Sequence, residues 1–551
     1  MDEGDPNPEH DLRATRMRDR EVQPAPESFP QLPEGFDDPE PIHDRPTIQI
    51  TTELHDTITE SCSALAADRN VFARDGQLVN VIRCDEADAD TYIGVGAPKI
   101  RIIAMATMRE RLTRCATYVK ADARRKNESV RCIPKDDVVS GVLHRGEYPG
   151  IRPIVGILEA PSMRPDGSLI QRRGYDQRTG YLYEPNATFD EIPEKPTQTD
   201  AAMALRTLLS VFADFPFAID AGRTAAVAAI LTILARPAIT GAVPAFIVDA
   251  STRGTGKSLA TDVIGVIATG RATAKMSWPA DDVELEKVLG GYAVRGAMLV
   301  NFDNVVRPFG GGPLDRCLTA VDTVELRILG KTEVPEVLWR AVVLATGNNI
   351  SLTGDTARRS LICRLESSLE HPEDREDFTH ANLVQWCRSN RPRLVVAALT
   401  ILRGWFVGGK QAGEGKRWGS FESWSEMIPR AITFAGGADP MGARPAATDQ
   451  EEPEKAALIG ILDGLPMLDT EGTGLAARDM VKLLYPLSRE DRTPDGHDAL
   501  RDSIESLVPG TKAPTSKTLG NALRKLKHRV VGGRCLDSRA AGQHRVVWVV
   551  R

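Results

Sequence analysis

The sequence lacks several features that would place the chain in a specialised class. Its eight cysteines are scattered and no two form a C-x-x-C pair, which argues against a zinc site or a disulfide framework and favours a reducing cytosol. Aromatic residues make up only 5% of the chain. The longest apolar helical run, residues 224–235, lies between Arg223 and Arg236 and is too short to span a bilayer. We therefore expect a cytoplasmic protein that does not enter a membrane.

Chain length and the distribution of charge are more informative about domains and partners than average composition is. A chain of 551 residues is too long for one hydrophobic core, so several domains are expected. The net charge of −7 hides an asymmetry. Residues 1–45 hold 13 acidic and 5 basic residues, whereas residues 511–551 hold 10 basic residues against the single acid Asp537. An acidic head and a basic tail predict an anionic partner for the C-terminal end.

Composition and periodicity divide the chain into five parts. Residues 1–45 hold eight prolines and predict a disordered acidic arm. Residues 46–195 predict an α+β N-terminal domain. Strands alternating with helices over residues 196–410 predict an α/β domain with a parallel sheet. Residues 411–455 have the glycines and turns of a linker. Residues 456–551 predict three helices followed by a β-hairpin, the order of a winged helix-turn-helix.

A glycine-rich loop follows the short apolar strand predicted at residues 246–248 and precedes a helix. Backbone N–H groups at such a helix N-terminus bind phosphate, and glycines allow the chain to turn tightly around it. Lys257 is expected to reach the β- and γ-phosphates of ATP, and Ser258 to bind Mg²⁺. The first glycine of the usual pattern is replaced by Ser251. The loop that carries these roles is Arg253, Gly254, Thr255, Gly256, Lys257 and Ser258.

An acidic residue at the end of a neighbouring strand completes a magnesium–phosphate site. The predicted strand 297–300 leads to Asp303, which is expected to bind the metal beside Ser258, either directly or through a metal-bound water. The next position usually holds a glutamate that polarises the attacking water, and here it is Asn304. An amide orients water but does not accept its proton, so hydrolysis is slow or the base comes from elsewhere, with Glu284 and Glu286 as candidates.

Two further elements follow along the chain. The apolar strand 341–345 leads to Asn348 and Asn349, and one of these two, Asn348 first, is expected to position the attacking water beside the γ-phosphate. Ten positions after Asn349 an arginine pair follows. An arginine that reaches a neighbouring subunit's γ-phosphate would make hydrolysis depend on assembly. Arg359 is the first candidate for this role, Arg358 the second and Arg364 a third.

With these motifs in order, the chain resembles superfamily 3 helicases, and more closely the helicase half of phage and plasmid primase-helicases of the poxvirus type. No primase domain is evident. The resemblance rests on residues 254–258, 302–304, 345–349 and 355–359. It implies an AAA+ core that uses ATP and Mg²⁺ as a homohexameric ring with the arginine in trans. It also implies movement on single-stranded or forked DNA during phage, prophage or plasmid replication, with other replication proteins as further partners.

Two segments are expected to contact DNA. The resemblance places a β-hairpin in the ring channel, and residues 324–334 alternate around Gly330-Lys331, which predicts a hairpin with Lys331 at its tip. In the basic tail, the helix predicted at residues 516–527 has an apolar face and a basic face that suits phosphates or the major groove. Its basic residues are Lys517, Arg524, Lys525 and Lys527.

The residues leave three functions open. The first is an ATP-driven DNA helicase. The second is an AAA+ ATPase that loads a helicase or remodels another protein. The third is a nucleotide-gated DNA-binding protein with little turnover, for which Asn304 is the main support. Strand separation, partner-dependent turnover, and tight ATP binding without phosphate release distinguish the three.

Overall fold

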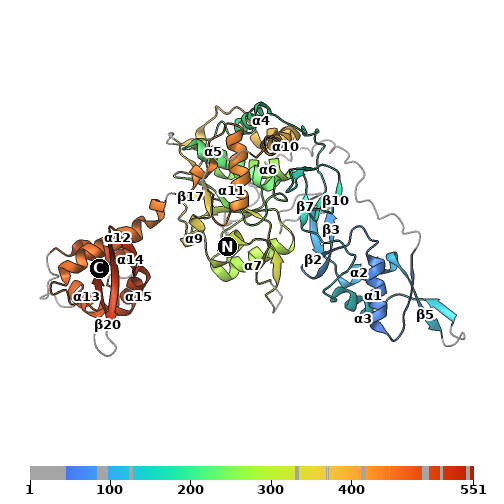
Figure 1. Cartoon of the computed structure of the whole chain (residues 1–551), viewed down its shortest axis with the longest axis horizontal. Coiled ribbons are helices and arrows are strands. Elements are labelled where there is room, and N and C mark those ends of the chain that lie inside the picture. The colour runs from blue at the N-terminus through green and yellow to red at the C-terminus, as the bar shows by residue number, and fades with distance from the viewer. Residues whose placement is uncertain are drawn as a thin grey trace, which may run out of the picture.

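The structure is a computed structural model that describes residues 45–83, 97–122, 128–328, 334–367, 369, 371–410, 417–445, 447–486, 496–508, 513–540 and 546–551. Residues 1–44 of the predicted acidic arm, and Lys331, lie outside the described residues. The described chain has a central α/β body with an N-terminal lobe on one side and a C-terminal lobe on the other (Figure 1). It is a mixed α/β multidomain protein.

A five-stranded parallel sheet forms the centre of the body, with the strand order β13-β14-β17-β12-β18. Every residue of β12 is buried, including Asp249, and its apolar residues 245–248 are typical of a central parallel strand. Because the strands are parallel, their carboxyl ends meet at one edge of the sheet. The strands are β12 (Ala245–Ala250), β13 (Lys275–Met276), β14 (Leu299–Val305), β17 (Val342–Asn348) and β18 (Ser360–Leu365).

Helices cover both faces of this sheet. Side chains of β12 alternate between the faces: Phe246 and Val248 join one core, and Ala245 and Ile247 join the other. The first core is closed by α4 (Gln198–Val211), α5 (Asp220–Leu234), α6 (Lys257–Thr269) and α10 (Leu383–Val407). The second core is closed by α7 (Asp282–Val294) and α8 (Gly312–Thr319).

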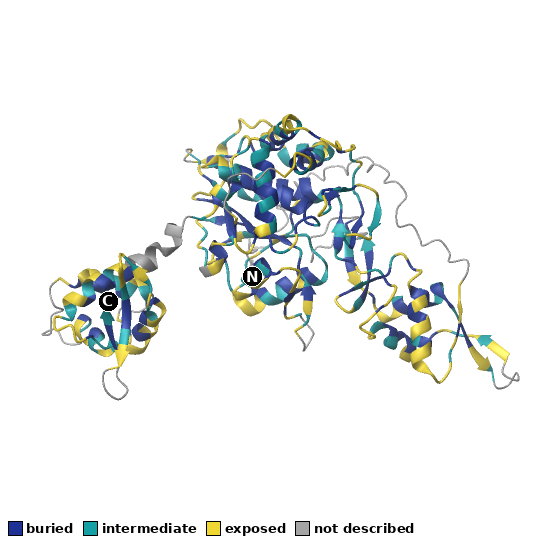
Figure 2. Cartoon of the chain, in the orientation of Figure 1, coloured by how far each residue is buried: buried dark blue, intermediate teal, exposed yellow. Residues whose placement is uncertain are grey.

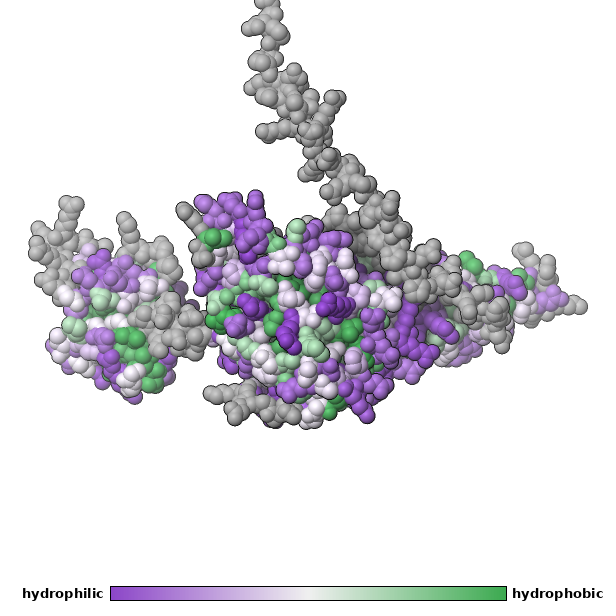
Figure 3. All heavy atoms as spheres, turned by 90° about the horizontal axis from the view of Figure 1, so that it is seen from above, coloured by the Kyte–Doolittle hydropathy of each residue, from purple (hydrophilic) through white to green (hydrophobic). Residues whose placement is uncertain are grey.

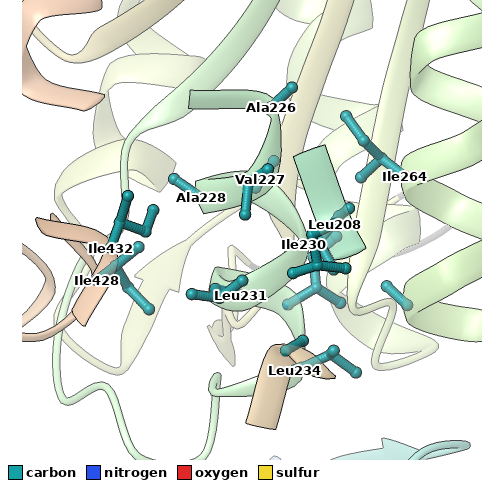
Figure 4. Close-up of a cluster of buried hydrophobic side chains, with 14 of the residues drawn as sticks. Leu208, Ala226, Val227, Ala228, Ile230, Leu231, Leu234, Ile264, Ile428 and Ile432 are labelled. Atoms are coloured by element: carbon teal, nitrogen blue, oxygen red, sulfur yellow. The ribbon is translucent and has the colours of Figure 1, made fainter. Parts of the chain in front are cut away.

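Helix α5 lies at the centre of the first core. Its apolar residues point to all sides, and twelve of its fifteen residues are buried. Figure 4 shows Val227, Ile230 and Leu231 among side chains of α4, α6 and a further helix, α11. A helix that is apolar all round needs such a site. This confirms the buried helix predicted for residues 224–235.

The predicted linker over residues 411–455 is wrong for much of its length. Helix α11 (Glu422–Phe434) and the short 3-10 helix η4 (Pro440–Ala443) belong to the first core. Trp424 is fully buried, and its indole Nε1 donates to Thr232 Oγ1 at 2.8 Å. The glycines that suggested a linker lie at the ends of α11, while the apolar residues between them pack. Residues 411–416 lie outside the described part of the chain.

The remaining elements of the body lie around the sheet. Strands β15 (Thr323–Glu325) and β16 (Glu336–Leu338) pair antiparallel, as a hairpin requires, but the second strand begins beyond the predicted segment 324–334. The register pairs Glu325 with Glu336. Each strand has three residues, fewer than the alternating pattern suggested. Short helices α9 (Gly354–Ala357) and η3 (Pro372–Asp374) flank β18 in the sequence.

The N-terminal lobe is mixed α and β, with small sheets. Three helices share one core, and a β-rich part lies next to the central body (Figure 1). The helices are α1 (Leu54–Leu65), α2 (Met105–Cys115) and α3 (Asp136–Leu143). The sheets are β1 (Thr47–Gln49) with β5 (Thr117–Asp122) and β6 (Glu128–Arg131); β2 (Phe72–Arg74) with β3 (Gln77–Arg83) and β4 (Pro98–Ile102); β7 (Gly156–Leu158) with β10 (Gly174–Asp176) and β11 (Tyr181–Tyr183); and β8 (Ser162–Met163) with β9 (Leu169–Ile170).

A buried arginine joins this lobe to the body. The Arg74 guanidinium donates to the carbonyl of Ile154 at 3.1 Å in its own lobe, and to that of Ala293 at 2.9 Å in the body. Figure 2 shows dark, buried segments continuing from the body towards this lobe. Figure 3, from above, shows many hydrophilic residues over the same junction.

The C-terminal lobe has its own core of helices and a three-stranded antiparallel sheet. The three predicted helices and both β segments are present; α12 was not predicted. The elements are α12 (Ala447–Leu468), α13 (Ala477–Leu484), α14 (Asp498–Leu507), α15 (Ser516–Leu526), β19 (Val530–Val531), β20 (Arg534–Ala540) and β21 (Val546–Val550). Among the helices of the described residues, none is both long enough and apolar enough to cross a bilayer.

Candidate nucleotide-binding site

The glycine-rich loop lies between the carboxyl end of β12 and the first turn of α6. Gly254 and Gly256 have φ values of 77° and 88°, a backbone region that favours glycine. A Cβ at Gly256 would also stand 3.1 Å from the Phe215 ring. The two glycines therefore let the chain turn directly into α6, so the first N–H groups of the helix open towards the loop.

Lys257 folds back over this loop. Its Nζ donates to the Thr252 carbonyl oxygen at 2.9 Å and to Thr255 Oγ1 at 3.2 Å. Partial burial lowers the pKa of Lys257, although the nearby Asp249 carboxylate opposes this shift. The ammonium group is thus held over the loop by neutral oxygens, which an anionic group can replace.

Ser258 and Asp303 meet although they are 45 residues apart. Ser258 Oγ donates to Asp303 Oδ1 at 2.8 Å. Thr346 Oγ1 donates to the same Asp303 oxygen at 2.7 Å and accepts from the Asn304 N–H at 2.9 Å. The structure thus joins α6, β14 and β17 at one edge of the sheet through a carboxylate and two hydroxyls.

Thr346 is the member of this network that sequence reasoning did not single out. It is buried in β17, two residues before Asn348. A signal that could have identified it is its position within the segment 345–349, on the same face of the strand as Asn348. The hydroxyl fixes both the Asp303 side chain and the backbone of Asn304.

The residue set suits Mg²⁺ bound with a nucleotide. Among the described residues, no group of three or more His, Cys, Asp or Glu side chains forms a metal cage. Mg²⁺ keeps several waters and uses substrate phosphates with only one or two protein oxygens. Ser258 and Asp303 supply a hydroxyl and a carboxylate at the loop, so the donor set fits a metal that arrives with its phosphates.

Asn304 adopts a left-handed backbone with φ of 54°, which asparagine tolerates better than most residues. The two glutamates considered as substitutes make other contacts. Lys287 Nζ donates to Glu284 at 3.0 Å, and Arg316 Nη2 donates to Glu286 at 2.8 Å. Neither glutamate contacts the Ser258–Asp303 network in the structure.

Asn348, the last residue of β17, and Asn349, which follows it, have different surroundings. Asn348 pairs in register with Ala250 at the end of β12, and its buried Oδ1 accepts no hydrogen bond within the described part of the chain. Asn349 accepts from Arg364 Nη2 at 2.8 Å. Arg364 also forms an ion pair with Asp249, the β12 residue opposite it in register. Arg364 is therefore held by contacts within the chain, and Asn348 keeps an available acceptor.

The two arginines after α9 differ in exposure: Arg359 is half-buried and Arg358 is exposed. Arg359 is only 14% exposed at its side chain and forms ion pairs with Asp315 at 2.9 Å and Asp355 at 3.0 Å. Arg358 is 68% exposed, and among the described residues its one ion pair is with Asp355, at 2.7 Å. Arg358 therefore has the freer guanidinium, whereas Arg359 is held by two ion pairs.

The basic residues of helix α15 in the C-terminal lobe differ in their contacts with other side chains. Lys517 and Lys525 are exposed, and Arg524 donates to Asn521 Oδ1 at 2.8 Å on the same helix. Lys527 lies 3.4 Å from the Asp537 carboxylate, which also pairs with Arg551 at 3.0 Å. Lys527 is therefore partly neutralised within the lobe.

Comparison with known proteins gives a weak likeness. No family model matches the chain, and no curated protein does. Among solved structures, an apo form of the NrS-1 C-terminal region is 11% identical, with a TM-score of 0.34, over 86% of this chain and 96% of that one. A JCV helicase structure is 13% identical, with a TM-score of 0.19, over 50% of this chain and 75% of that one.

Proposed function

We propose that the chain is an ATP-hydrolysing AAA+ protein of the superfamily 3 type that acts as a DNA helicase. The observation that carries this proposal is the 2.8 Å hydrogen bond between Ser258 and Asp303 at the mouth of the glycine-rich loop. A phosphate loop, a metal-binding hydroxyl and a strand-end carboxylate are the parts that magnesium-dependent phosphoryl transfer requires.

Each residue has a role in this proposal. The N–H groups of residues 253–258 and the Lys257 ammonium bind the phosphates, and Ser258 and Asp303 hold Mg²⁺, which neutralises charge on the transferring group. Thr346 keeps the Asp303 carboxylate turned towards Ser258. Asn348 Oδ1 orients the attacking water, because it is a buried acceptor with no other donor among the described residues.

We further propose a ring in which Arg358 enters the site of the neighbouring subunit. Its exposure and single surface ion pair support this choice over Arg359. In the same proposal the β15–β16 hairpin faces the ring channel, and the C-terminal lobe is a winged helix-turn-helix that binds DNA phosphates through Lys517, Arg524 and Lys525. Three helices and an antiparallel hairpin in that lobe support this assignment.

The test is ATP-dependent unwinding of a forked DNA duplex by the full chain, with Lys257→Ala as the control that removes the phosphate contact. Unwinding by the wild-type chain and not by the variant supports the helicase. ATP hydrolysis without unwinding would overturn it in favour of a loader or remodelling ATPase.

A second candidate is a nucleotide-gated DNA-binding protein with little turnover. The observation that favours it is the amide of Asn304 at the position where a catalytic base is usual. In addition, the two candidate bases make other contacts, Glu284 with Lys287 and Glu286 with Arg316. Tight ATP binding with no phosphate release would select this candidate.

A further inference from the structure

A cavity of about 400 Å³ lies between the N-terminal lobe and the central body. Its walls include the ends of α6 and α7, the start of β14, and β7 from the N-terminal lobe. The start of β14 is at the amino end of the sheet, whereas the glycine-rich loop is at the carboxyl end. The cavity and the candidate nucleotide site therefore lie at opposite edges of the same sheet.

The walls carry more positive than negative charge. Lys99, Arg271, Arg295 and Arg388 line the cavity against one carboxylate, Glu159, which pairs with Arg271. Among the described residues, Arg295 and Arg388 have no carboxylate partner; Arg295 instead lies over the Tyr292 ring at 4.1 Å. The carboxyl ends of α5, α6 and α7 each contribute about half a negative charge. These partial charges offset only part of the excess positive charge of the side chains, so the cavity favours an anion.

The rest of the lining limits what kind of anion fits. Leu158, Leu234 and Met298 give the cavity an apolar wall, which inorganic phosphate does not need. Asn301, which is 1% exposed, also lines it, and its Oδ1 has no donor among the described residues. Its amide nitrogen is already used, since it donates to Thr273 Oγ1 at 2.8 Å. A ligand that satisfies all three features has an anionic end, an apolar body and an N–H donor.

We propose that this cavity is a second binding site, for a nucleoside phosphate, distinct from the glycine-rich loop. Its volume falls at the lower end of the range of about 300–1,000 Å³ seen for small-molecule sites. Arg295 and Arg388 bind the phosphate groups, and the base lies against the apolar wall with an N–H towards Asn301. Asn301 precedes Asp303 by two residues on β14, and α6 runs from Lys257 to the cavity wall, so an occupant contacts both elements of the candidate nucleotide site.

The experiment is calorimetric titration of the full chain with ADP. Two ADP molecules per wild-type chain are expected, and one per chain after Lys257→Ala. Adding Arg295→Glu and Arg388→Glu to Lys257→Ala should weaken the remaining site by a hundredfold or more, since each guanidinium–phosphate contact contributes about tenfold. Adding Arg206→Glu, which reverses an exposed arginine on α4, should leave it unchanged.

A second variant keeps the charge and fills the space. Ala297→Phe on the Lys257→Ala background should also abolish the remaining site, because Ala297 lines the cavity. Loss of all ADP binding after Lys257→Ala overturns the proposal. It is also overturned if the remaining site binds ADP equally well after the Arg295→Glu and Arg388→Glu changes and after Ala297→Phe. If the glycine-rich loop itself binds no nucleotide, wild type and Lys257→Ala each bind one ADP, and the cavity changes remove it.

Discussion

Replacing Arg358 and Arg359 by alanine, one at a time, separates a structural arginine from a catalytic one. Loss of Arg359 leaves Asp315 and Asp355 without their shared partner. Breaking a fully buried pair costs about 3–5 kcal/mol. Both carboxylates are partly exposed and retain other partners, so about 2 kcal/mol is expected for Arg359→Ala. For a domain of about 200 residues this lowers Tm by about 4–8 °C.

Arg358→Ala should do the opposite. It removes one exposed i,i+3 ion pair, which contributes about 0.5 kcal/mol or less, so Tm should hardly change. If Arg358 stabilises charge in the neighbouring site, ATP turnover should fall by about a thousandfold or more. Thermal unfolding and steady-state phosphate release, measured on both variants at a temperature where both are folded, check the two expectations.

A mixing experiment tests the action in trans. Lys257→Ala chains keep the arginine but lack the phosphate contact, and Arg358→Ala chains have the reverse defect. Mixed subunits should regain part of the turnover that each variant lacks alone. Turnover within twofold of wild type for Arg358→Ala, with loss of activity in folded Arg359→Lys chains, would refute the reasoning and assign the role to Arg359.

Three further outcomes are expected. Because burial lowers the pKa of Lys257, its charge is lost at a lower pH than for an exposed lysine, so ADP affinity at the loop should fall as pH rises through that pKa. In ADP titrations across alkaline pH, the Lys257→Arg variant should show a flat profile. A fall in affinity shared by the wild-type and Lys257→Arg chains would contradict this. Asn304→Asp places a carboxylate where the left-handed backbone tolerates it and should raise kcat at least tenfold; an unchanged kcat would mean that the base lies elsewhere. Lys517→Ala with Lys525→Ala should reduce the salt dependence of DNA binding by about two in log–log slope; Lys527→Ala is the weaker matched change, because Asp537 already neutralises part of that charge.

The polar ends of the strands were predictable because they depend on local sequence. An apolar run followed by glycines, Lys257 and Ser258 has few other backbone solutions, and parallel strands bring their carboxyl ends to one edge. The pairing of Ser258 with Asp303 followed from that rule. The turn around Lys331 lies outside the described residues, so its role stays a prediction.

Other features depended on packing between distant segments. Trp424 looked like part of a linker because short-range composition does not report that Thr232, 192 residues away, receives its N–H. From the sequence, Arg359 was the first candidate and Arg358 the second, whereas in the folded chain Arg359 is held by ion pairs with Asp315 and Asp355. Thr346 and the cavity beside Asn301 were also decided by tertiary structure. Local sequence is enough to place polar groups at the strand ends. Which charges are buried or paired depends on neighbours far away in the chain, and no local pattern specifies them.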